Sequence, residues 1–150
     1  MIVDFGLTDM NLTLARVANC THGGPLDICS ICEVLNCDEN IHVDGSWVYN
    51  KPRFTSISIS IAGKRWGIVT IPGEALSAIG TDIRAHGDKL GFDDVLLFGY
   101  TNNHMGYFTT PREYDIGGYE GLLSFWGIGE GDKIADSCKL VLEQVAPKDL

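Results

Sequence analysis

Alternation of apolar and polar residues marks two strands in the middle of the chain. Residues 54–61 read FTSISISI and residues 66–71 read WGIVTI, with Gly63 and Lys64 between them. A period of two places alternate side chains on opposite faces of a sheet, and glycine in a short connection is typical of a hairpin turn. The pattern therefore predicts a β-hairpin. Residues 10–18 alternate in the same way and predict a further half-buried strand.

The period changes after the hairpin and predicts a helix followed by a third strand. Pro72 and Gly73 break the strand, and residues 74–90 then place apolar side chains at helical spacing. Residues 95–100 (VLLFGY) form a continuous apolar run, which is typical of a strand buried on both faces of a sheet. Strand, helix and strand together predict a β-α-β unit whose two strands are parallel.

A second helical pattern lies near the C-terminus. In residues 132–145 the apolar side chains recur at helical spacing and favour a stripe that faces the core. The preceding stretch, 114–125, is rich in glycine and aromatic residues. We predict an α/β fold in one domain covering residues 1–150, with a mixed sheet, a β-α-β unit and a C-terminal helix.

Residues 19–51 predict a long Cys-rich irregular loop. Such a loop needs either covalent pinning or a functional reason. Two disulfides in an oxidising compartment, a structural zinc, or free thiols are the alternatives. The glycosylation-type tripeptides that begin at Asn11 and Asn19 favour disulfides and an extracellular or secreted location. The four clustered cysteines are Cys20, Cys29, Cys32 and Cys37.

Charge and hydropathy exclude two classes of partner. The chain has 20 acidic and 11 basic residues, and its net charge of −9 repels phosphate backbones, so we expect no nucleic-acid partner. No apolar run approaches the roughly 20 residues of a membrane span, so we expect no transmembrane segment. The first ten residues also lack the pattern of a signal peptide.

Polar residues follow both strands of the predicted β-α-β unit. Glu74 follows the first strand, and the segment 101–107 (TNNHMGY) follows the second. Because ligands gather at the carboxyl ends of parallel strands, we expect these residues to converge on one edge. On local pattern alone, Glu74 also fits the first turn of a helix, where backbone N–H groups favour negative charge. The second segment likewise fits an ordinary polar turn.

Several short motifs in 71–125 resemble the end of the catalytic domain of neutral, non-lysosomal ceramidases. They occur in the family's order and at compatible spacing, and the resemblance fades outside this region. A helix that carries Arg84 follows the first motif. The motifs are Ile71-Pro-Gly-Glu74, Gly99-Tyr-Thr-Asn102, Tyr107-Phe-Thr-Thr110, Glu113-Tyr114 and Tyr119-Glu120-Gly121.

This resemblance implies a zinc-dependent hydrolase that cleaves the amide of N-acylsphingosine. It implies that Glu74 and Tyr107 are zinc ligands and that Tyr119 lies beside the scissile carbonyl as a catalytic group. Zinc lowers the pKa of bound water and polarises the amide, and a phenol can donate to the developing oxyanion. The implied substrate is a lipid amide similar to ceramide.

The chain departs from the family pattern upstream of Glu74. The family carries His-Thr-His-Ser-Gly-Pro, with a zinc ligand and a second active-site histidine, where this chain reads Cys20-Thr-His22-Gly-Gly-Pro. This correspondence makes Cys20 a candidate metal ligand and His22 a candidate catalytic residue, and His42 is a candidate for the second zinc histidine. The segment that carries the family's serine and substrate-binding arginine has no counterpart.

Three functional hypotheses follow. The chain is a fragment, processed chain or minimal relative of a ceramidase-like enzyme, with its site completed by an upstream segment, another chain or a homo-oligomer. Alternatively, it is a non-catalytic extracellular binding or assembly module that kept the fold and lost the metal. The third hypothesis is an unrelated thiol-dependent enzyme that uses Cys20 and His22.

Overall fold

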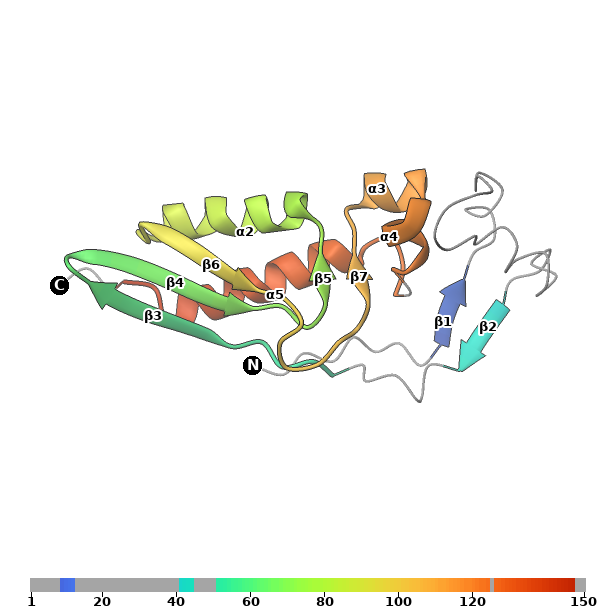
Figure 1. Cartoon of the computed structure of the whole chain (residues 1–150), viewed down its shortest axis with the longest axis horizontal. Coiled ribbons are helices and arrows are strands. Elements are labelled where there is room, and N and C mark those ends of the chain that lie inside the picture. Colours follow the sequence, from blue (N-terminus) through green and yellow to red (C-terminus); the bar gives the residue numbers. More distant parts are fainter. Residues whose placement is uncertain (1–8, 13–40, 45–50, 125, 148–150) are drawn as a thin grey trace.

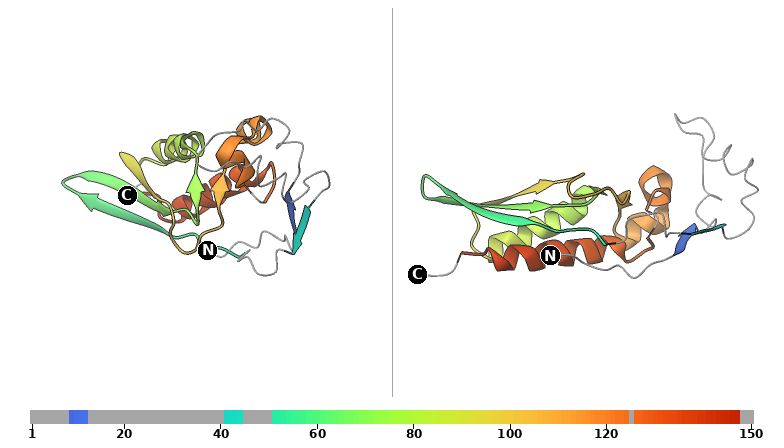
Figure 2. Two further views of the ribbon diagram at one scale, coloured as in Figure 1. Left: turned by 45° about the vertical axis from the view of Figure 1, so that its right-hand side comes forward. Right: turned by 90° about the horizontal axis from the view of Figure 1, so that it is seen from below.

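A computed structural model describes residues 9–12, 41–44, 51–124 and 126–147. Its main part has two layers, a three-stranded sheet and a pair of helices on one face of it, which the right-hand view of Figure 2 shows below the sheet (Figures 1 and 2). Strand β3 (Ser56–Ile61) runs antiparallel to β4 (Lys64–Thr70), and β4 runs parallel to β6 (Asp94–Phe98). The predicted hairpin and the parallel strands of the β-α-β unit are confirmed, and so is the mixed α/β fold.

The hairpin turns more tightly than the sequence pattern indicated. Ala62 (φ 51°) and Gly63 (φ 78°) form the two-residue connection, and Lys64 is already the first residue of β4, opposite Ile61. Two successive residues with positive φ are characteristic of a type I′ turn, whose twist matches that of the strands it joins.

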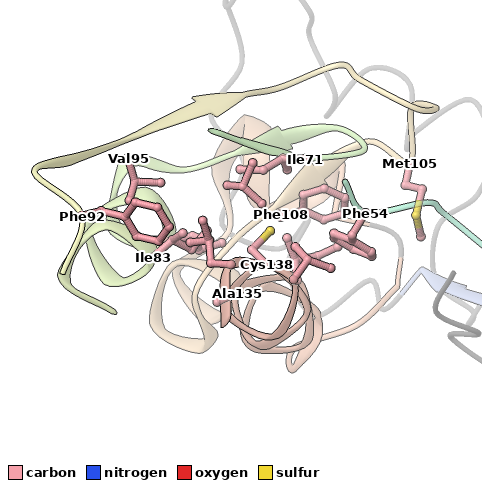
Figure 3. Close-up of a cluster of buried hydrophobic side chains, with 14 of the residues drawn as sticks. Phe54, Ile71, Ile83, Phe92, Val95, Met105, Phe108, Ala135 and Cys138 are labelled. Atoms are coloured by element: carbon pink, nitrogen blue, oxygen red, sulfur yellow. The ribbon is translucent and has the colours of Figure 1, made fainter. Parts of the chain in front are cut away.

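Helices α2 (Ser77–Lys89) and α5 (Glu130–Gln144) cover one face of this sheet. Val69 and Val95 of the sheet belong to the core between the layers. Figure 3 shows Val95 among the buried side chains. A Cβ on Gly67 would lie 3.1 Å from Leu142 Cδ2, so this glycine lets α5 approach the sheet closely. The apolar stripe expected on the C-terminal helix is confirmed as core. The larger apolar side chains that the two helices bury are Ile79, Ile83, Ile134, Cys138, Val141 and Leu142.

The opposite face of the sheet is apolar and exposed. Ile57, Ile59 and Ile61 of β3 are 37–62% exposed, as are Leu96 and Phe98 of β6. The expectation that 95–100 is buried on both faces is therefore wrong, because helices cover only the side to which Val95 points. On β3 the serines face the helices instead, and Ser56 Oγ donates to the carbonyl oxygen of Val141 at 2.5 Å.

A second small sheet lies beyond the carboxyl ends of β4 and β6. Strand β5 (Glu74–Ala75) pairs in parallel with β7 (Tyr107–Phe108). The helix expected to start at Glu74 begins instead at Ser77, because residues 74–75 join this ladder. Short helices α3 (Pro111–Ile116) and α4 (Gly118–Leu122) follow. Thr110 begins α3 through a capping box with Glu113, in which each side chain bonds the other residue's backbone N–H.

Strands β1 (Asp9–Leu12) and β2 (Ile41–Asp44) form a separate antiparallel pair, with His42 opposite Asn11. The strand expected at 10–18 is thus confirmed for residues 10–12, which belong to β1, whereas residues 13–18 lie outside the described residues. Strand β2 falls inside 19–51, so that segment is not irregular throughout. The cysteine cluster at positions 20–37 lies outside the described residues, and its pairing stays a prediction. None of the described helices is long and apolar enough to cross a bilayer.

Glu130 is a carboxyl group buried at the start of α5. Its side chain is 2% exposed, and neither oxygen has a hydrogen-bond partner among the described residues. Burial raises the pKa of Glu130 to about 9, and the nearby backbone of Trp126 and the charge of Lys133 lower it only in part. The carboxyl is therefore protonated in the folded chain at neutral pH.

The raised pKa predicts a stability that falls with pH. Below the pKa of the unfolded chain, near 4.5, Glu130 is neutral in both states and costs nothing; as pH rises towards 9, only the unfolded chain ionises. We expect Glu130→Gln to be about as stable as wild type at pH 4 and more stable by about 1 kcal/mol or more at pH 8. Urea unfolding across this range measures the difference, and parallel pH profiles for the two proteins would contradict the assignment.

Candidate functional site

The Pro72-Gly73 corner positions Glu74 after β4. The carbonyl oxygen of Pro72 accepts from Met105 N at 2.8 Å, and Glu74 N donates to the carbonyl oxygen of Gly106 at 2.9 Å. A Cβ on Gly73 would clash with that same oxygen of Gly106 and with the ring of Phe108. Glycine is required here because two stretches of backbone touch.

This contact places Glu74 directly opposite Tyr107 in the β5–β7 ladder. The prediction that the polar segments after the two strands converge on one edge is confirmed for these residues. Because Glu74 is a ladder residue outside α2, the alternative in which it sits in the first turn of a helix is wrong.

Three further side chains gather around the Glu74 carboxylate. His104 Nε2 lies 3.9 Å from Glu74 Oε1, and the imidazole stacks on the ring of Tyr100 with centroids 5.3 Å apart. A hydrogen bond to Glu74 is the main cause that raises the pKa of Tyr100, and likewise that of Tyr107. Both phenols are therefore neutral donors beside a carboxylate that is 22% exposed.

Tyr119 completes the group from the start of α4. Its ring meets that of Tyr107 edge to face, with centroids 5.4 Å apart and planes at 77°. Gly117 (φ 78°) and Gly118 (φ 81°) turn the chain between α3 and α4, a backbone conformation that glycine adopts without strain. The resemblance-based candidates Glu74, Tyr107 and Tyr119 thus share one site.

The turn after β6 contributes residues that the sequence did not single out as ligands. Tyr100, Asn102 and Asn103 all have positive φ, which non-glycine residues rarely adopt. Asn102 Nδ2 donates to the carbonyl oxygen of Arg53 and to Thr55 Oγ1, each at 3.1 Å, which ties this turn to the hairpin. Strain held in this way is common at functional sites. The sequence did contain a signal for these residues, because Tyr100 and His104 flank the polar Thr-Asn-Asn turn that follows β6.

Of the remaining candidates, Cys20 and His22 lie outside the described residues, and His42 lies in β2. Within the described ranges, no group of three or more His, Cys, Asp or Glu side chains gathers to hold a metal. The donors that do meet are the Glu74 carboxylate, the phenols of Tyr100 and Tyr107, and the His104 imidazole. Oxygen and imidazole nitrogen are donors that zinc accepts, so the chemistry of this set fits a zinc ion.

Comparison with solved structures shows a ceramidase-like fold. The neutral ceramidase from Pseudomonas aeruginosa matches 91% of this chain with a TM-score of 0.54 and 20% identity. A ceramidase complexed with C2 matches the same share with a TM-score of 0.52 and 18% identity. This chain spans 22% of the length of each of these proteins. No family model matches the sequence, and neither does any curated protein.

The Gly73 contact predicts that Gly73→Ala destabilises the protein and disrupts the site. The added methyl group forces Gly106 away and moves Tyr107 off Glu74, at a cost of about 1 to 3 kcal/mol in unfolding free energy. Gly129→Ala is the matched control, because nothing lies within 4 Å of a Cβ there and its φ of −92° suits alanine. Equal unfolding free energies for the two variants would contradict the close contact.

Proposed function

We propose that this chain contributes part of the active site of a zinc-dependent hydrolase that cleaves the amide of an N-acyl sphingoid lipid. The observation that carries the proposal is the pairing of Glu74 with Tyr107, with Tyr119 against the Tyr107 ring. The ceramidase-like fold supports it, because the chain resembles ceramidases in overall arrangement as well as in these short motifs.

Each residue has a role that follows from its chemistry. A zinc ion, when bound, supplies a Lewis acid for the amide and a water of lowered pKa. Glu74 contributes a negative oxygen donor, and Tyr107 contributes a second oxygen. His104 contributes an imidazole nitrogen, which brings the donors of this chain to the three protein ligands usual at a catalytic zinc. Tyr119 presents a phenol that donates a hydrogen bond to the carbonyl oxygen as negative charge develops on it.

Cys20, His22 and His42 retain their proposed roles as further ligands and as a second active-site histidine. Alternatively, the remaining zinc ligands and the second active-site histidine come from an upstream segment, a second chain or another copy of this chain. A secreted protein with disulfides in the cysteine cluster is the setting we propose.

One observation favours the alternative of a non-catalytic binding or assembly module. The exposed apolar face of β3 and β6 is the kind of surface that proteins bury against a partner. A module that kept the fold and lost the metal would retain this face while Glu74 and Tyr107 served only in the ladder.

Zinc binding tests the metal site directly. We expect Glu74→Gln and Tyr107→Phe each to weaken zinc binding about tenfold or more, because each removes a proposed ligand oxygen. Glu143→Gln is the matched control, since Glu143 is a carboxylate on α5 that pairs with His86. Competition titration with a chromogenic chelator gives the affinities. Unchanged zinc affinity in both site variants would remove the metal-site proposal.

Hydrolysis of a fluorogenic N-acyl substrate distinguishes the enzyme hypothesis from the hypothesis of a non-catalytic module. We expect hydrolysis that needs zinc and stops with chelator. Tyr119→Phe should lower kcat about 10² to 10³-fold at unchanged zinc content, because only the donor to the oxyanion is lost. If another polypeptide completes the active site, that polypeptide must be present in the assay. A zinc-loaded complete assembly without turnover would favour the binding module.

A further inference from the structure

A cleft of about 410 Å³ runs between α2 and the β6 side of the sheet. Its walls are largely aliphatic and include Ile71, Leu76 and Leu97. Glu74 lies at the end nearest the start of α2, and Arg84 lines the cleft further along that helix. Arg84 lies seven positions after Ser77 in α2, so the cleft extends roughly 10 Å along this helix.

The guanidinium of Arg84 is held in place by one hydrogen bond and keeps further N–H groups for a ligand. Its Nε donates to the carbonyl oxygen of Val95 at 3.2 Å, which anchors the guanidinium against β6. Within the described part of the chain, its two terminal nitrogens have no hydrogen-bond or ion-pair partner. A guanidinium fixed through Nε presents its remaining N–H groups as a fork that matches a carboxylate.

Gly80 lines the cleft at a point where Leu97 packs closely against α2. A Cβ at this position would lie 3.0 Å from Leu97 Cδ1 and 3.5 Å from Arg84 Nη1. A side chain at this position would therefore crowd Leu97 and stand against the guanidinium, which would narrow the cleft between them. Glycine in a helix interior costs about 1 kcal/mol relative to alanine, and here it admits Leu97 without pushing a methyl group into the cleft wall.

The charges at the two parts of the cleft orient a ligand. The Glu74 carboxylate repels an anion, whereas Arg84 attracts one, and the walls between them are apolar. A ligand that fits all three features has a negative head group at Arg84, an aliphatic body against Leu97 and its other end towards Glu74 and Tyr100.

We propose that this cleft binds a medium-chain anionic amphiphile through its carboxylate, with Arg84 as the recognition residue. The proposal goes beyond the amide hydrolase, because binding here requires neither zinc nor turnover. If the hydrolase is also correct, a ligand held by Arg84 directs its far end at the proposed metal site, and amides with a carboxylate at that spacing become favoured substrates.

Calorimetric titration of the zinc-free full chain with decanoate, below its micellar concentration and with chelator present, tests the proposal. We expect Arg84→Gln to weaken decanoate binding about ten- to a hundredfold, through loss of charge-assisted hydrogen bonds. Lys89→Gln is the matched control, because it removes a positive charge from α2 at a residue that does not line the cleft. That variant should bind decanoate like wild type.

Two further experiments distinguish the contribution of the ligand's carboxylate from that of its aliphatic tail. Decanol should bind wild type more weakly than decanoate and should be insensitive to Arg84→Gln, and acetate should not compete with decanoate. Gly80→Ala should weaken decanoate and decanol alike, with thermal unfolding confirming that it folds. The proposal is overturned if decanoate fails to bind wild type, binds Arg84→Gln equally, or binds no more tightly than decanol.

Discussion

The close approach of two backbone segments at Gly73 is the constraint on which the candidate site depends. Since no side chain separates Gly73 from Gly106, the chain after β4 and the chain before β7 form a short parallel ladder. That ladder holds Glu74 opposite Tyr107 and delays the start of α2 to Ser77. The ladder fixes the backbone of Glu74, and hydrogen bonds from the phenols of Tyr100 and Tyr107 hold its carboxylate, as a metal ligand requires.

Glu74 is shared by two environments. On one side lie the phenols and the imidazole of the proposed zinc site, and on the other lies the aliphatic cleft that reaches Arg84. A ligand in the cleft therefore ends beside the proposed metal donors. The exposed apolar face of the sheet is a separate feature, because α2 and α5 lie on the opposite side and leave β3 and β6 uncovered. Recognition of a small ligand and association with a partner would use different surfaces.

Patterns with a strong local cause were predictable from the sequence. The hairpin, the β-α-β unit and the C-terminal helix follow from side-chain periodicity, which depends only on neighbouring residues. The direction of burial was not predictable for β3, because alternating Ile and Ser define two faces without saying which one meets a helix. Here the serines face the helices, and Ser56 bonds the carbonyl oxygen of Val141. The meeting of Glu74 and Tyr107 was expected from parallel topology and is borne out.

Tertiary structure alone decided the remaining features of the site. Sequence determined the hairpin, the β-α-β unit, the C-terminal helix and the carboxylate and phenol that follow the two parallel strands, since these are local or follow from the handedness of the crossover. It did not place His104 beside Glu74, orient Arg84 through the carbonyl oxygen of Val95, or bury Glu130 with no hydrogen-bond partner among the described residues. These depend on contacts between residues far apart in the chain, whose distances are set only when the helices pack on the sheet.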